Sequence, residues 1–151
     1  MENMQYLIND PDVAVAYVDG SYDADTKRYA GSIVMLYNGE QKNFSFVGSN
    51  ETLASMRNVA GEIRAAEKAM EIATFSGATK LVLCYDYIGI ENWAMEKWKA
   101  GKEGTIRYKE RYDLFSQLID IEFVKIKAHS GDKYNEIADK LARDALFGTA
   151  S

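Results

Sequence analysis

The chain is poor in the residue types that form covalent cross-links or bind soft metals. It has 151 residues with one cysteine, Cys84, and one histidine, His129. A single cysteine cannot form an internal disulfide, and its place inside an apolar run is typical of a small buried core residue. One histidine without a group of thiolates also argues against a zinc site. We therefore expect a fold that needs neither disulfides nor zinc.

Long apolar segments and an amino-terminal export signal are lacking as well. No apolar run approaches the length of a membrane span. Residues 1–12 lack a basic start followed by an apolar stretch. The hydrophobic content of 47% and the charged content of 27% are typical of globular proteins, and the length suits one domain. We expect a single cytoplasmic domain with no membrane contact, and no protein partner is evident.

An excess of positive charge is also missing, since the net charge is −5. Taken alone, this argues against a nucleic-acid partner, because phosphate binding usually leaves a basic footprint. The charge is uneven, however. Residues 91–112 carry six lysines and arginines against four glutamates, a local charge of +2 that leaves −7 for the rest. One weakly basic segment therefore stands in an acidic chain.

Apolar runs and turn residues predict an α/β domain. Strands are expected at residues 13–19, 29–37, 41–47, 81–85 and 122–127, and helices at about 53–76, 88–98, 106–119 and 135–147. Asn38-Gly39 is the strongest short hairpin signal and joins the second strand to the third. The order βββαβααβα predicts a five-stranded mixed sheet, three antiparallel strands followed by two parallel strands, flanked by helices.

Four acidic residues occupy positions where an unpaired carboxylate is costly. Asp19 and Asp86 each end an apolar run, Glu62 lies on the small-residue face of the long helical segment, and Asp139 interrupts the apolar stripe of the last helix. The carboxyl ends of parallel strands share one edge of a sheet, so these acids are expected to converge. A cluster of hard oxygen donors suits Mg²⁺ or Mn²⁺.

Each of these residues also has a simpler interpretation when taken alone. Asp19 before a glycine is typical of a turn, and Glu62 suits a solvated helix position. Asp86 suits a helix cap, and Asp139 has Lys140 and Arg143 as neighbours to pair with. A lone histidine in a glycine-containing loop, such as His129, usually has no role. The joint pattern favours a functional site.

Four segments together resemble the type 1 ribonucleases H. They are YVDGSY (17–22), GEIRAAEKAM (61–70), YD (85–86) and KAHSGDKYNEIADKLA (127–142). The resemblance implies a ribonuclease H-like fold with a catalytic domain over residues 13–147. Residues 1–12 would be an N-terminal extension or a linker remnant, and residues 148–151 a tail.

By this resemblance, Asp19, Glu62, Asp86 and Asp139 would be catalytic, metal-binding carboxylates. His129 would assist proton transfer or product release. Such enzymes cut the RNA strand of an RNA–DNA hybrid with two Mg²⁺ ions, for which Mn²⁺ is a substitute, and leave 5′-phosphate and 3′-hydroxyl ends.

The resemblance also implies a set of substrate contacts: Gly20, Ser21, Asn58, Trp93, Trp98 and Asn135. An alternative for both tryptophans is a core-facing position on an amphipathic helix. Departures from the family pattern are Val59, where relatives often have a polar group, and Tyr87-Ile88 after Asp86. These departures concern substrate binding and do not change the four carboxylates.

Two other functions share much of this pattern. One is another nuclease on the same fold, such as a DNA resolvase, transposase or exonuclease, since fold does not dictate substrate. The segment from His129 to Asp139 speaks against it. The other is a catalytically silent nucleic-acid-binding module, which the complete acidic set argues against, because excess carboxylate repels phosphate unless a cation is held.

Overall fold

A five-stranded mixed sheet forms the centre of the computed structural model, which describes residues 10–49, 56–127 and 131–148. The strands are β1 (Val13–Asp23), β2 (Arg28–Tyr37), β3 (Glu40–Gly48), β4 (Lys80–Tyr85) and β5 (Asp120–Lys125). Their spatial order is β3-β2-β1-β4-β5, with β1, β2 and β3 antiparallel and with β4 and β5 parallel to β1. The predicted α/β fold and element order are confirmed.

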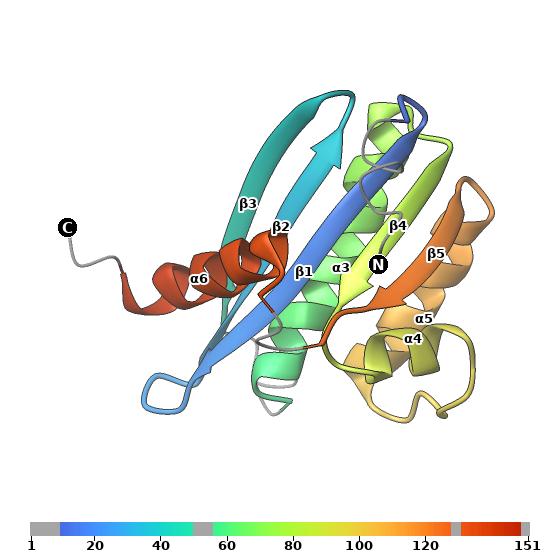
Figure 1. Ribbon diagram of the computed structural model, residues 1–151. Coiled ribbons are helices and arrows are strands. Elements are labelled where there is room, and N and C mark those ends of the chain that lie inside the picture. Colours follow the sequence, from blue (N-terminus) through green and yellow to red (C-terminus); the bar gives the residue numbers. More distant parts are fainter. Residues whose placement is uncertain (1–9, 50–55, 128–130, 149–151) are drawn as a thin grey trace.

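Helices cover both faces of the sheet (Figure 1). They are α3 (Asn58–Ser76), α4 (Gly89–Ala94), α5 (Glu103–Ser116) and α6 (Lys133–Phe147). The helices α3, α4 and α5 pack on one face, and α6 packs alone on the other. Among the described helices, none combines the length and the apolar character that a membrane crossing requires.

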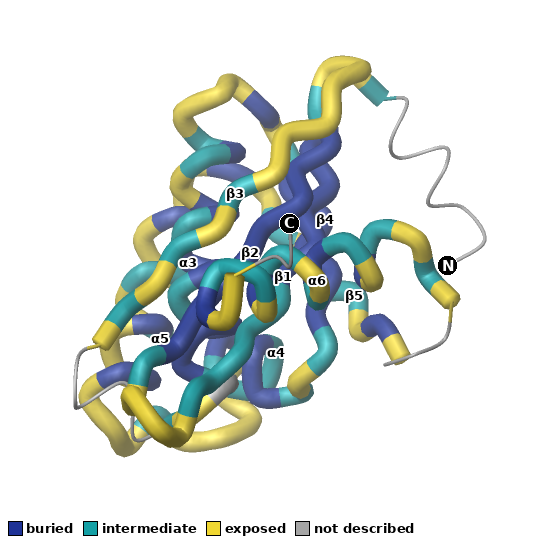
Figure 2. Tube along the Cα trace, turned by 90° about the vertical axis from the view of Figure 1, so that its left-hand side faces the viewer, coloured by how far each residue is buried: buried dark blue, intermediate teal, exposed yellow. Residues whose placement is uncertain are grey.

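The residues of β1 alternate between the two faces, as the period of a strand requires. Ala14, Ala16 and Val18 belong to the core beneath α3, whereas Val15 and Tyr17 belong to the core beneath α6. Burial on both faces explains why this strand reads as a continuous apolar run. Figure 2 shows the same burial along the middle of the sheet. Cys84 is buried on β4, as expected.

The turns and helix ends refine the predicted boundaries. The Asn38-Gly39 hairpin is confirmed, with φ of 55° and 77° at the two residues. The strand predicted to end at residue 19 extends to Asp23, because β2 pairs with it along its whole second half. The helix predicted from about residue 53 begins at Asn58, and residues 50–55 lie outside the described part.

The two helices after β4 also differ from the prediction in their bounds. The helix expected over 88–98 ends at Ala94, where the chain turns and Glu96 adopts a left-handed φ of 62°. The helix expected over 106–119 runs instead from Glu103 to Ser116. It begins earlier because the Thr105 hydroxyl accepts the N–H of Lys102 at 3.1 Å and caps the first turn.

Two glycines let α3 contact the sheet through its backbone. A Cβ atom at Gly61 would lie 1.8 Å from the carbonyl oxygen of Ala30 and 3.1 Å from Cα of Gly20. A Cβ atom at Gly31 would lie 2.5 Å from the carbonyl oxygen of Gly61. No side chain therefore fits between the start of α3 and the middle of the sheet.

We predict that Gly61→Ala lowers the free energy of unfolding by about 2–3 kcal/mol, because backbone atoms on both sides must move to admit the methyl group. Urea unfolding followed by circular dichroism measures this. Gly101→Ala is the matched control, since nothing lies within 4 Å of a Cβ at that position. An unchanged urea midpoint for Gly61→Ala would show that the close contact does not constrain the fold.

Candidate active site

Asp19 stands where β1 and β4 separate. The parallel pairing of the two strands ends at Tyr17 and Cys84, although β1 continues to pair with β2. Asp19 is half-buried, and its Oδ1 accepts the backbone N–H of Gly20 at 2.8 Å. Asp86 follows β4 directly and is half-buried as well. Both carboxylates thus lie two residues beyond the last paired residues of the neighbouring parallel strands β1 and β4.

Glu62 joins this edge from α3. It is only 4% exposed, so it is not the solvated helix residue that its position alone suggested. Its Oε2 accepts the backbone N–H of Asp86 at 2.9 Å and that of Tyr87 at 3.3 Å. These bonds tie the first turns of α3 to the end of β4 and hold the Glu62 carboxylate beside Asp86.

Asp139 reaches the site from the opposite face on α6. The start of that helix is capped by Asp132, whose Oδ1 accepts the N–H groups of Tyr134 and Asn135, both at 3.1 Å. The Ser32 hydroxyl of β2 donates to the carbonyl oxygen of Ala138 at 2.5 Å and fixes the helix against the sheet. The Asp139 carboxylate pairs with Arg143 one turn later, at 3.1 Å.

The electrostatics show that these carboxylates share one environment. Burial raises the pKa of Asp19 from 3.8 to about 6; the N–H of Gly20 opposes this rise, whereas the carboxylates of Asp139 and Asp86 add to it. Burial also raises the pKa of Glu62 from 4.5 to about 8, to which the Asp19 carboxylate contributes. Mutual repulsion of carboxylates is the condition that a bound cation relieves.

The donor chemistry fits a hard divalent cation. The four side chains offer only carboxylate oxygens, which suit Mg²⁺ or Mn²⁺. Within residues 10–49, 56–127 and 131–148, no three His, Cys, Asp or Glu side chains stand close enough to enclose an ion unaided. Mg²⁺ keeps several waters and binds through one or two carboxylates plus substrate phosphates, so a partial protein shell fits it.

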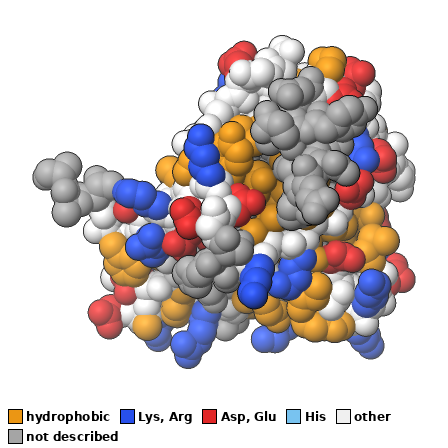
Figure 3. All heavy atoms as spheres, in the orientation of Figure 1, with side chains coloured by type: hydrophobic (Ala, Val, Ile, Leu, Met, Phe, Trp, Pro, Cys, Tyr) orange, Lys and Arg blue, Asp and Glu red, His pale blue; other side chains and the backbone are white. Residues whose placement is uncertain are grey.

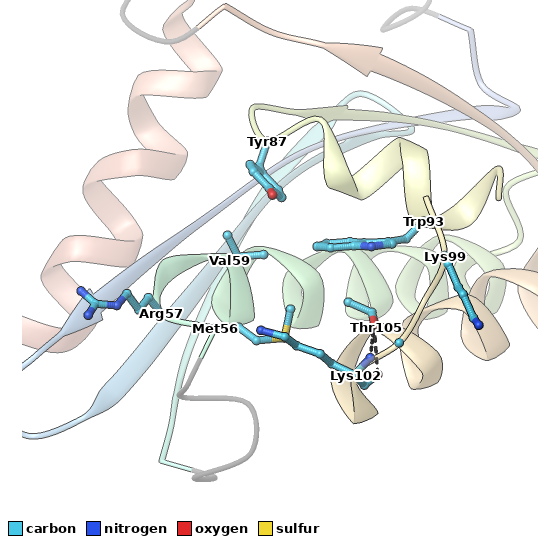
Figure 4. A pocket seen from close by; sticks show the side chains of 9 residues that line it. Met56, Arg57, Val59, Tyr87, Trp93, Lys99, Lys102 and Thr105 are labelled. Carbon is cyan, nitrogen blue, oxygen red and sulfur yellow. Dashed lines mark hydrogen bonds between the residues drawn. The ribbon is translucent and has the colours of Figure 1, made fainter. Parts of the chain in front are cut away.

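A cavity of about 500 Å³ lies between the start of α3, α4 and the start of α5, with Tyr87, the residue after Asp86, in its wall (Figure 4). Its lining residues combine apolar and basic side chains: Met56, Arg57, Val59, Tyr87, Trp93, Lys99, Gly101, Lys102 and Thr105. Trp93 lies in the wall, as a substrate contact would, and also packs against the main core. The structure thus shows the core contact of Trp93, and its role as a substrate contact stays a prediction.

Trp98 packs against two aromatic residues that line the cavity. Its ring centroid lies 5.7 Å from that of Trp93 and 6.1 Å from that of Tyr87. It is 39% exposed, which excludes the core-facing alternative for this residue. Tyr87, one of the departures from the family pattern, thus forms part of this aromatic group.

The other predicted residues lie in different settings. Gly20 and Ser21 continue β1 beyond Asp19, and Asn135 is buried in the first turn of α6. His129 and the side chain of Asn58 lie outside the described residues. Sequence reasoning did not single out Arg57, Lys99 or Lys102 as site residues, although two of them fall in the basic segment 91–112.

Charge is distributed unevenly over the surface that carries the site. On the face shown in Figure 3, some acidic side chains stand near the middle and several Lys and Arg side chains lie below them, although both signs also occur elsewhere on this face. Opposite charges within one surface suit a polyanion whose backbone meets the cations while a metal ion offsets the acids.

Comparisons with known proteins bear on the family and the fold. A family model described as RNase H matches residues 11–147. The ribonuclease H of Clostridium botulinum is 22% identical over 140 residues, which cover 87% of this chain and 94% of that protein. The crystal structure of RNase H1 from the halophilic archaeon Halobacterium salinarum aligns with a TM-score of 0.73 at 21% identity, covering 89% of this chain and 97% of that one.

A third similar structure is that of LC11-RNase H1 in complex with an RNA/DNA hybrid. It aligns with a TM-score of 0.68 at 14% identity and covers 88% of this chain and 99% of that one. The structural likenesses show a common fold, and the family match confirms the resemblance found in the sequence. Matched over nearly its whole length, the chain belongs to the RNase H family and is an enzyme of the ribonuclease H class.

Proposed function

We propose that this enzyme is a divalent-metal-dependent endonuclease that cuts the RNA strand of RNA–DNA hybrids, leaving 5′-phosphate and 3′-hydroxyl ends. The observation that carries the proposal is the buried Glu62 carboxylate. The backbone N–H of Asp86 binds it at the end of β4, and the Asp19 carboxylate contributes to its raised pKa. The crystal complex of the similar LC11-RNase H1 with a hybrid supports the substrate class. A cytoplasmic setting accords with the single, buried Cys84.

The chain's own residues would hold and orient the ions and the substrate. Glu62 is immobilised by two backbone N–H groups, and Asp19 by one, so both carboxylates present fixed oxygens. Asp86 and Asp139 would complete the set from β4 and α6. Two bound ions, Mg²⁺ or Mn²⁺ as a substitute, would activate a water and stabilise the attacking and leaving oxygens of the phosphodiester.

Substrate contacts would come from both sides of the carboxylates. The backbone at Gly20 and Ser21 lies next to Asp19, and Asn135 stands one turn before Asp139. The cavity with Trp93 and the exposed Trp98 would receive a strand of the hybrid, with Lys99 and Lys102 near its phosphates. Asn58, one turn before Glu62, would read the minor groove, where 2′-hydroxyls distinguish RNA.

Asp19→Asn is predicted to lower the rate of hybrid cleavage about a thousandfold or more, because loss of an ion ligand removes several kcal/mol of transition-state stabilisation. Cleavage of a labelled hybrid with Mg²⁺ or Mn²⁺ measures this, alongside single-stranded RNA and duplex DNA. Asp113→Asn, at an exposed acid on α5, is the control and should cleave like the wild type. An intact RNA strand with the wild-type enzyme would refute the proposal.

His129→Ala is expected to slow cleavage by about a factor of ten to a hundred without abolishing it, since the residue would assist proton transfer rather than hold an ion. Single-turnover and steady-state rates on the same hybrid separate proton transfer from product release. Lys127→Ala controls for the neighbouring positive charge. Equal rates for His129→Ala and wild type would remove this role.

The metal-free enzyme is predicted to lose stability as pH rises from about 4 to 8. The pKa values of Asp19, about 6, and of Glu62, about 8, exceed their ordinary values of 3.8 and 4.5, so the folded state binds more protons. Asp19→Asn should therefore gain stability over wild type by about 3 kcal/mol between pH 4 and 6. It should gain somewhat more between pH 6 and 8, because removing the Asp19 carboxylate also lowers the pKa of Glu62.

Urea unfolding in EDTA across this pH range, repeated with Mg²⁺, tests the linkage. Mg²⁺ should stabilise the wild type more than Asp19→Asn at pH 8, because only the wild type offers the full carboxylate set. A difference between the two proteins that does not vary with pH would contradict the electrostatic account.

A further inference from the structure

A second group of positive charges lies along α3 and α5, apart from the carboxylates. Arg64 and Lys68 on α3 and Arg107 on α5 line a cavity of about 390 Å³. Its other wall includes Tyr29 at the start of β2 and Phe46 and Val47 at the end of β3. We call this cavity the basic cleft. Its described lining contains three cations and no acid, in a chain whose net charge is −5.

The basic cleft is separate from the active site. Arg64 follows Glu62 by two positions, which places the two side chains roughly 200° apart around the helix axis. The cleft also shares no lining residue with the cavity of Figure 4. The same helix therefore carries catalytic carboxylate on one side and positive charge on the other.

A buried carboxylate holds two of the arginines in place. Glu67 is 6% exposed, and its Oε1 lies 3.2 Å from Nη1 of Arg64 and 3.4 Å from Nε of Arg107. Its Oε2 is buried and has no hydrogen-bond partner among the described residues. Burying a carboxylate costs several kcal/mol unless it is paired, so the arrangement keeps both guanidinium groups fixed.

The charges that adjoin the cleft include two acids, but the cations still outnumber them. Arg111 lies on α5 one turn after Arg107 and lines a smaller cavity of about 90 Å³ that adjoins the cleft and also contains Glu67 and Glu71. The ammonium of Lys68 lies 5.4 Å from the centre of the Phe46 ring. Fixed guanidinium groups, an ammonium and an apolar wall match the phosphates and sugars of a nucleic-acid backbone.

We propose that the basic cleft is a second anion site, which binds the phosphodiester backbone of the hybrid outside the segment being cut. This inference rests on the proposed function, because the hybrid is the polyanion that the active site would hold. Glu67 acts as a positioning residue that fixes Arg64 and Arg107. Through the cleft, an acidic protein would bind its substrate at a place that does not depend on the metal-binding carboxylates.

Binding of a fluorescent hybrid of about 20 base pairs tests the proposal in an Asp19→Asn background, which prevents cleavage. Lys68→Gln removes one charge and leaves Glu67 paired with its two arginines. It should raise the Kd about threefold and reduce the slope of log Kd against log salt by about 1. Adding Arg111→Gln should raise the Kd about tenfold in total and reduce the slope by about 2.

Lys42→Gln is the matched control, because Lys42 is an exposed lysine toward the other end of β3 and its loss changes the net charge equally. Its Kd and salt slope should remain those of the Asp19→Asn background, and all variants should unfold at the same temperature. Equal salt slopes for Lys68→Gln and Lys42→Gln would overturn the proposal.

Two further outcomes separate this inference from the proposed function. If the wild-type enzyme cuts the hybrid but Lys68→Gln and Lys42→Gln have equal salt slopes, the cleft proposal is wrong and the proposed function stands. If the wild-type enzyme neither binds nor cuts the hybrid, both the cleft proposal and the proposed function are wrong. If a glutamate-rich peptide binds and Lys68→Gln weakens only that binding, the cleft serves an acidic protein partner and the proposal is overturned.

Discussion

The backbone contact between α3 and the sheet is the constraint on which the site depends. At Gly61 the helix meets the carbonyl of Ala30 with no side chain between them. The next residue, Glu62, then comes close enough for the N–H groups of Asp86 and Tyr87 to bind its carboxylate. A wider spacing would break those bonds and separate Glu62 from the other acids. Displacements of about 1 Å are enough to impair positioned catalytic groups.

The same closeness creates an electrostatic cost. Burial and neighbouring carboxylates raise the pKa values of Asp19 and Glu62, which means that the charged form of each side chain is less stable here than in water. Backbone N–H groups offset part of this cost, and the charge of Arg143, which pairs with Asp139, offsets a smaller part at Asp19. Holding these acids close together costs free energy that a bound cation would offset. The fold thus loses stability at the edge where the proposed chemistry would take place.

Positive charge is placed by the same helices. The starts of α3 and α5 bring Arg57, Lys99 and Lys102 to the cavity of Figure 4, whereas the following turns carry the cations of the basic cleft. The chain therefore has two local positive surfaces, the cavity of Figure 4 and the basic cleft, although its net charge is −5. Association with a polyanion depends on such local fields more than on the total charge.

The sequence by itself determined the fold class, the order of the elements and the segments that carry the family resemblance. Apolar periodicity, the Asn38-Gly39 turn and the spacing from His129 to Asp139 act over short stretches, so they can be recognised without coordinates. Boundaries were less certain: α4 ends at Ala94 because the chain turns there, and α5 begins early because Thr105 caps it.

Only the tertiary structure decided that Glu62 is buried, that Trp98 is exposed while Trp93 lines a cavity, and that Glu67 binds arginines from two helices. Each of these features joins segments far apart in the chain or depends on how two surfaces pack. Local sequence patterns carry no direct record of such distances. The acids could be found from sequence because they violate the local pattern, whereas the basic cleft could not, because each of its cations suits an ordinary helix surface on its own.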